Sequence, residues 1–227
     1  MERFAQFSSR DVFRVAAGWR PEKREDRWPA RYNISPGDQV LVMHEFQGYD
    51  RREIAIARWG YRPGWAERRS LPAEPTFAGP KAPESKYFKL LWEHRRRCVV
   101  PMDGWYEWLE VDGRRRAYFI QRKGGRPCYA AALTNVDPAD PWRASGVTIL
   151  THPIEHGVVD RAVPRPVLLS REAMSQWICQ STVPYDCGPM LAHPTAPDLE
   201  AIALAASMSN PKAEGPDLLE PLLLARA

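Results

Sequence analysis

The segment from Arg97 to Trp108 constrains the fold most, because it places strand-forming residues on both sides of a turn signal. Residues 98–100 and the aromatic residues after Gly104 favour a pleated surface, so we expect two strands folded against each other at Asp103-Gly104. Alternation along the second strand sends Trp105 and Glu107 to one face. One carboxylate is therefore expected among large aromatic side chains.

Glu107 is the candidate for a general acid or base. An ion among aromatic side chains loses hydration, so this carboxylate is expected to have a raised pKa or to be held by hydrogen bonds or by an ion pair with an arginine. The alternative is a structural carboxylate bonded to a neighbouring arginine or backbone amide. The segment alone leaves both interpretations open.

Composition indicates one globular domain spanning residues 1–227. With 227 residues, of which 44% are hydrophobic and 11% aromatic, the chain can bury a full core. The 22 prolines against 14 glycines favour short elements joined by stiff loops. No apolar run approaches the roughly 20 residues of a membrane span, and the amino end lacks the apolar core of a signal peptide. We therefore expect a soluble, cytoplasmic protein with no membrane partner.

Short strands with few helices predict an α+β fold built on curved, mainly antiparallel sheets. The expected strands cover residues 39–44, 53–60, 117–121, 128–133 and 147–151. The expected helices cover residues 10–17, 85–94, 170–178 and 198–206. Ser9 and Ser170 stand where they cap the helices that follow them.

Neither a metal ion nor a cofactor is expected. The four cysteines, at positions 98, 128, 179 and 187, lack CxxC spacing, and Cys98 and Cys128 lie in apolar runs typical of core strands. His152 and His156 have i,i+4 spacing, but Pro153 separates them and no third ligand is near in sequence. The chain also has no glycine-rich loop of the kind that binds phosphates.

Charge is distributed unevenly along the chain. Residues 1–127 carry 26 Lys and Arg against 17 Asp and Glu, a balance of +9, whereas residues 128–227 carry 6 against 11, a balance of −5. The basic part is interleaved with tryptophans, including Trp59, Trp65 and Trp92, a pattern typical of single-stranded nucleic-acid binding. The alternative is a solvated face, which we favour for Arg114–Arg116 because they follow the Asp112-Gly113 hairpin signal.

Seven blocks, in order, resemble the SOS-response-associated peptidase (SRAP) family of abasic-site-processing proteins. They are Arg3–Gln6, Arg31–Gly37, Trp59–Trp65, Phe88–Trp92, Arg97–Trp108, Val158–Leu168 and Ser209–Leu218. Together they span nearly the whole chain. The resemblance implies a barrel-like arrangement of the sheets with short helices at the periphery.

The resemblance also implies an activity. Members bind single-stranded DNA at an abasic site, and a cysteine at residue 2 joins its thiol and α-amine to the sugar aldehyde as a thiazolidine; peptidase-like hydrolysis is attached to the same site. An Asn, a Glu and a His support this chemistry. Here Glu2 replaces the cysteine and Ala162 lies where the His is expected. The family's Asn-Ala-Arg loop corresponds to Pro72-Ala73-Glu74, which lacks the Asn and has an acid where a phosphate-binding Arg is expected. Of the four, the chain keeps Glu107.

The chain matches the family's DNA-contacting residues better than it matches the catalytic ones. Arg3, Asn33, Pro36, Trp65 and Thr151 fall where members place contacts to the DNA backbone and bases. Each also has a structural interpretation, since Asn33 and Pro36 suit a turn, Trp65 suits a core, and Thr151 ends a strand. Arg3 has the least reason to be buried.

The sequence therefore favours a catalytically degenerate SRAP protein that binds single-stranded, abasic or otherwise damaged DNA without the crosslink. One alternative is an interaction or scaffold protein with no DNA role. Another is an enzyme of altered chemistry, either a hydrolase using Glu107 or an imine-forming lyase using the amine of Met1, which we expect to be retained because Glu2 is large.

Overall fold

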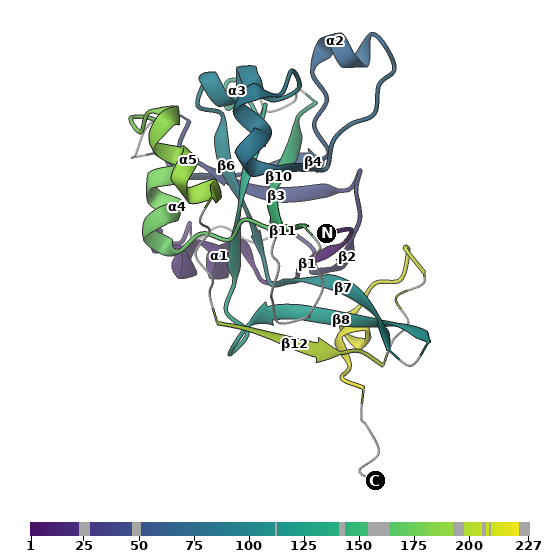
Figure 1. Ribbon diagram of the computed structural model, residues 1–227. Helices are drawn as coiled ribbons and strands as arrows, with labels where there is room; N and C mark the ends of the chain where they lie inside the picture. The colour runs from purple at the N-terminus through teal and green to yellow at the C-terminus, as the bar shows by residue number, and fades with distance from the viewer. Residues whose placement is uncertain are drawn as a thin grey trace.

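A computed structural model describes residues 1–22, 28–46, 51–111, 113–140, 144–153, 164–192, 198–205, 208 and 210–222. Its strands form two mostly antiparallel sheets, and its helices are short and lie at the periphery (Figure 1). The predicted α+β class with curved, mainly antiparallel sheets is confirmed. Within the described residues, no helix is long and apolar enough to cross a membrane.

The smaller sheet carries the amino end of the chain at one side. Its strands, in spatial order, are β12 (Leu199–Ala203), β8 (Arg114–Arg122), β7 (Gly104–Val111), β1 (Phe4–Gln6) and β2 (Arg31–Ile34). β7 and β8 pair directly from Trp105↔Ile120 to Val111↔Arg114, so the predicted turn between them is confirmed. β2 is the edge strand, and its outer side faces the C-terminal segment of the chain (Figure 1).

The larger sheet closes into a ring, because β10 pairs with both β4 and β9. Its strands, in spatial order, are β11 (Pro164–Pro166), β10 (Gly146–Pro153), β4 (Glu53–Trp59), β3 (Gln39–His44), β6 (Arg97–Met102) and β9 (Cys128–Thr134), with β5 (Thr76–Ala78) paired to β10. Both faces of β3 are buried: Val40 and Val42 join one apolar cluster, and Leu41 and Met43 join the other. The predicted core positions of Cys98 and Cys128 are confirmed.

Helices cover the face of the ring to which Leu41 and Met43 point. They are α1 (Arg10–Ala16), α3 (Lys89–Glu93), α4 (Arg171–Ile178) and α5 (Pro184–Ala192), with a 3₁₀ turn at Gly79–Glu84. The short helix α2 (Gly64–Glu67) lies apart from them on a projecting loop (Figure 1). A second 3₁₀ turn, Pro216–Leu219, packs with Leu218 and Leu219 against the Tyr106 and Phe119 cluster of the smaller sheet. Phe13 of α1 and Trp177 of α4 are fully buried in this layer. The predicted caps are confirmed, since Ser9 Oγ accepts from Val12 N at 3.2 Å and Ser170 Oγ accepts from Ala173 N at 3.2 Å.

The prediction that the strands around Asp103 fold against each other is wrong. β6 pairs with β3 and β9 in the ring, whereas β7 pairs with β1 and β8 in the smaller sheet. Asp103 fixes a corner between the sheets, because its carboxylate accepts from the backbone N–H groups of Phe7 (2.6 Å) and Ser8 (2.9 Å). Gly104 is required there, since a Cβ would lie 2.5 Å from the carbonyl oxygen of Ile120.

Two predicted helices also differ. Residues 198–206 were expected to be helical, but Leu199–Ala203 pair with β8, where the cross-strand partners outweigh the local preference. The helix predicted over 85–94 is confined to Lys89–Glu93, with a 3₁₀ turn before it that ends at Glu84. Ser85, between the two, has extended backbone angles (φ −73°, ψ 128°), so the two segments do not join into one helix.

Candidate functional site

Glu107 of β7 is held in a buried ion pair with Arg165 of β11. Arg165 Nε donates to Oε1 at 2.9 Å and Nη2 donates to Oε2 at 3.2 Å. The indole N–H of Trp105 donates to Oε1 at 2.9 Å, as the predicted alternation allows. The two charged side chains are only 4% and 8% exposed, so these bonds take the place of water around both charges. Of the two environments expected for Glu107, the structure has the arginine ion pair.

A cavity of about 300 Å³ lies against this pair. Its lining includes Met1, Glu2, Glu107, Trp108 and Pro164. The amino group of Met1 points to the carbonyl oxygen of Pro164 at 3.4 Å. Burial lowers the pKa of that amino group, and the negative charge of Glu107 opposes the shift. The lowered pKa increases the share of neutral, nucleophilic amine near neutral pH.

Two arginines flank the aromatic wall of the cavity. The guanidinium carbons of Arg3 and Arg115 lie 5.5 Å and 5.2 Å from the ring centroid of Trp108. Arg115 also approaches Glu2 at 3.7 Å, where both side chains are largely exposed. Trp108 therefore offers an aromatic surface with positive charge beside it, which is the chemistry that holds a nucleobase or a sugar-phosphate.

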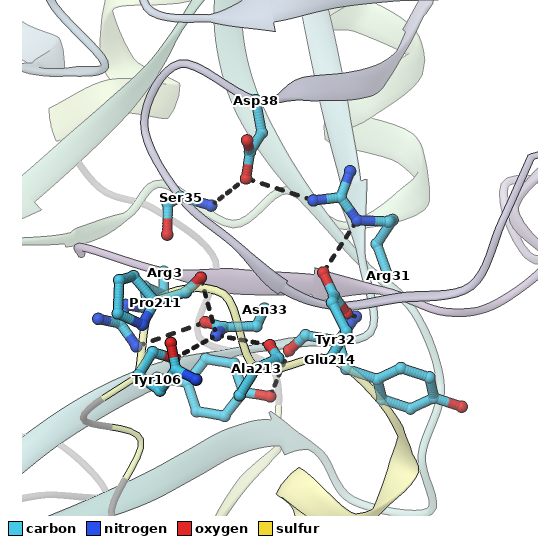
Figure 2. Close-up of polar contacts among 11 residues, drawn as sticks. Arg3, Arg31, Tyr32, Asn33, Ser35, Asp38, Tyr106, Pro211, Ala213 and Glu214 are labelled. Carbon is cyan, nitrogen blue, oxygen red and sulfur yellow. Dashed lines mark hydrogen bonds and ion pairs between the residues drawn. The ribbon is translucent and has the colours of Figure 1, made fainter.

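Arg3 and Asn33, two of the predicted DNA-contacting residues, meet in the structure (Figure 2). Arg3 Nη1 donates to Asn33 Oδ1 at 3.5 Å and to the carbonyl oxygen of Met208 at 2.6 Å. Asn33 is 2% exposed, and its Nδ2 donates to the carbonyl oxygens of Asn210, Pro211 and Ala213. Both side chains are thus engaged by the C-terminal segment.

None of the five predicted contact residues lines the cavity itself, and the other three lie elsewhere in the fold. Pro36 lines a second, polar cleft of about 660 Å³ together with Arg58. Trp65 lies half-buried on α2, on a loop that projects from the structure (Figure 1), with its ring edge-on to Tyr87. Thr151 is buried in β10, and its hydroxyl donates to the carbonyl oxygen of Phe77 at 3.2 Å.

Sequence reasoning missed Arg165 and the aromatic surface of Trp108. Arg165 is a single charge between prolines in an otherwise apolar run, a signal that points to a buried partner. Its identity as the partner of Glu107 depends on a contact across 58 residues, which local patterns do not contain. Ala162 and His156 lie outside the described residues.

The chain matches the family model described as SOS response associated peptidase (SRAP) over residues 2–211. It is 29% identical over 194 residues to the abasic site processing protein YedK of Escherichia coli, covering 85% of both chains. It is 28% identical over 243 residues to the abasic site processing protein HMCES of Pongo abelii, covering 89% of this chain and 68% of HMCES.

Solved structures share the architecture. A phage-related protein from Bordetella bronchiseptica superposes with a TM-score of 0.72 at 27% identity, covering 91% of this chain and 95% of that one. A protein from Bacteroides thetaiotaomicron gives a TM-score of 0.74 at 16% identity and shares the fold, covering 98% of this chain and 100% of its own. The chain therefore belongs to the SOS-response-associated peptidase (SRAP) family.

Proposed function

We propose that this protein binds single-stranded DNA at abasic sites, in the cavity beside Glu107, and does so without the thiazolidine crosslink. The observation that carries the proposal is the cavity itself, where the amino end of the chain meets the buried Glu107–Arg165 pair. Relatives that align over most of this chain are named abasic site processing proteins. The four free cysteines fit a reducing cytoplasmic location, which we also propose.

The cavity favours binding over thiol chemistry. A thiazolidine needs a thiol and an amine on adjacent carbons, and Glu2 supplies a carboxylate in that place. None of the four cysteines lines this cavity. Burial raises the pKa of the Cys128 thiol to about 12, so it is protonated and inert at neutral pH.

Preference for single strands follows from two half-buried aromatic side chains that have arginines beside them. Trp108 has Arg3 and Arg115 beside it, and Trp65 has Arg69 at 5.9 Å from its ring centroid. Unpaired bases stack on such rings, whereas bases inside a duplex are already stacked on one another. The arginines add a phosphate attraction that does not depend on sequence and that weakens with salt.

A second candidate activity is imine formation by the amino group of Met1. The lone pair on that nitrogen attacks the C1′ aldehyde of the open abasic sugar, and the carbinolamine then loses water to give the imine. The lowered pKa of the buried amine and its position in the same cavity favour this reaction. Hydrolysis returns the amine and the aldehyde, so the product is reversible, unlike a thiazolidine.

Fluorescence anisotropy with three labelled oligonucleotides tests the proposed binding: an abasic single strand, the intact single strand and the duplex. We expect the tightest binding to the abasic strand, the weakest to the duplex, and a steep loss of affinity as salt rises. Absence of binding to either single strand at low ionic strength would overturn the proposal and favour a scaffold without a DNA role.

A further inference from the structure

The carboxylate of Glu214 is bound by two donors of the edge strand β2 (Figure 2). Arg31 Nε donates to Oε1 at 2.9 Å, and the backbone N–H of Tyr32 donates to Oε2 at 2.7 Å. Each carboxylate oxygen thus receives one hydrogen bond. A guanidinium beside a free backbone N–H is also a donor set that proteins use for the oxygens of a DNA phosphate.

The Tyr32 donor is held in a fixed direction. The Tyr106 hydroxyl donates to the carbonyl oxygen of Tyr32 at 2.5 Å, and the ring of Tyr32 stacks on Phe7 with centroids 5.0 Å apart. β2 ends the smaller sheet, so its outer backbone groups are available to a partner other than a strand. The site is therefore built into the sheet edge and does not depend on the position of Glu214.

Arg31 does not need Glu214 as its counter-charge. Its Nη2 also lies 3.3 Å from Asp38 Oδ2, an oxygen that accepts from the backbone N–H of Ser35 at 2.9 Å. One guanidinium thus serves two carboxylates, and the local charge is negative. The Glu214 and Arg31 side chains are 38% and 26% exposed, so a competing anion can reach them from solvent.

The neighbouring contacts place this site on the predicted DNA-binding surface. The segment that carries Glu214 also accepts hydrogen bonds from Arg3, through Met208, and from Asn33, through Ala213. Arg3 lies beside Trp108, which lines the cavity, and it also donates to Asn33. A strand of DNA that enters the cavity passes close to negative charge held by the protein itself.

We propose that Arg31 and the backbone N–H of Tyr32 form a binding site for a backbone phosphate of single-stranded DNA, and that Glu214 occupies this site in the absence of DNA. The inference rests on the proposed DNA-binding function. Glu214 acts as a built-in counter-ion that the phosphate displaces. The displaced Glu214 carboxylate stays beside the bound phosphate and retains a cation there, so this contact contributes little to the salt dependence of binding by the unmodified protein.

The test compares Glu214→Gln with Glu93→Gln, which makes the same change in net charge on α3, where Glu93 pairs only with Lys89 among the described contacts. Glu214→Gln is expected to bind single-stranded DNA about two- to fivefold more tightly, the effect of one exposed ion pair. The slope of log K against log salt becomes steeper by up to about 0.7, the value for one unit of charge facing a single strand, because the variant has one carboxylate fewer beside the bound phosphate. Glu93→Gln leaves both quantities near those of the unmodified protein.

The variant Arg31→Ala tests whether the gain in affinity comes from this site. In the Arg31→Ala background, Glu214→Gln should give no gain in affinity, because the phosphate has lost its cation. A gain of the same size there would overturn the assignment, as would a folded Glu214→Gln protein with unchanged or weaker binding. The Tyr32 amide resonance supplies a readout that needs no variant: it should shift when DNA saturates the unmodified protein, and a constant resonance contradicts the site.

The same measurements separate an error in the phosphate site from an error in the proposed DNA-binding function. If the unmodified protein binds DNA but Glu214→Gln gives no gain, only the phosphate site is wrong. If the unmodified protein and every variant fail to bind at low salt, the DNA-binding function itself is wrong, and the phosphate site with it.

Discussion

Glu107 and Arg165 lie 58 residues apart in the chain and share one buried ion pair, with 2.9 Å between Oε1 and Nε. The pair joins β7 of the smaller sheet to β11 of the ring at the wall of the cavity. It therefore has two roles in our account. It connects the two sheets, and it holds a carboxylate and a guanidinium beside the place where the DNA is proposed to bind.

Breaking this pair should destabilise the fold. Glu107→Gln removes the carboxylate that neutralises the buried Arg165 charge, which costs about 3–5 kcal/mol in the free energy of unfolding. Replacing both residues, as Glu107→Gln with Arg165→Met, should recover most of that loss. Urea unfolding measures the stability of the single and the double variant. Glu110→Gln is the control, because Glu110 lies on the same strand and is exposed. Unchanged stability in Glu107→Gln, together with lost DNA binding, would show instead that the carboxylate acts on DNA.

Acid should destabilise the protein through His44. This side chain is 1% exposed, and burial, with a smaller contribution from Arg96, lowers its pKa to about 4 from its usual 6.5. The unfolded chain therefore binds a proton at higher pH than the folded chain does. Stability conferred by neutral His44 is complete above about pH 6.5 and falls as the pH drops toward 4, by about 3 kcal/mol.

His44→Gln removes this contribution. Urea unfolding of both proteins at several pH values should show a smaller loss between pH 6.5 and 4 for the variant. Burial raises the pKa of the neighbouring Glu45, so its protonation opposes the loss of stability in acid, and it does so in both proteins. If the free energy of unfolding changed with pH to the same extent in the two proteins, the role assigned to His44 would be contradicted.

Local patterns predicted the strand alternation and the helix caps correctly. Alternation placed Trp105 and Glu107 on one face, and the serines before α1 and α4 cap their helices as expected. These features depend on neighbours within a few residues. The α+β class also followed from the density of short strands.

Features that depend on distant partners were not predictable in this way. Asp103-Gly104 has the composition of a hairpin turn, but the amides of Phe7 and Ser8 turn it into a corner between sheets. Leu199–Ala203 form a strand because β8 offers an open edge. Likewise, neither Arg165 nor Glu214 carries a local signal for its partner, so half of the candidate site emerged only from the structure.

Trp65→Ala should weaken binding to single-stranded DNA by about 1–3 kcal/mol if the ring stacks on a base. The half-buried ring contacts Tyr87 and Arg69, at the end of a projecting loop. Tyr185→Ala is the matched control, since Tyr185 is 89% exposed on α5, away from the cavity. Anisotropy titrations at one salt concentration measure both. Equal DNA affinities of Trp65→Ala and Tyr185→Ala would show that Trp65 does not contact the DNA.

Restoring the amino-terminal sequence expected of the family should restore part of the crosslinking chemistry. Replacing Glu2 by Cys-Gly, with Met1 removed, supplies a thiol and an amine on adjacent carbons in the cavity. We expect a heat-stable adduct with abasic DNA in low yield, because the loop around Ala73 lacks the supporting Asn and Ala162 stands where the supporting His is expected. The yield of adduct on a denaturing gel, followed over time, measures this reaction. No adduct, from a variant that still binds abasic DNA, would mean that the cavity does not receive the sugar.

The most direct test of the central claim is a denaturing gel of the unmodified protein with an abasic single strand, run with and without borohydride. Our account predicts no heat-stable adduct without reduction. It predicts a reduced adduct that maps to Met1, with a yield that rises with pH as the amine, whose pKa burial places below 8.0, loses its proton. A heat-stable adduct formed without reduction, mapped to Met1 or to any of the four cysteines, would contradict the claim that this protein binds abasic DNA without a stable crosslink.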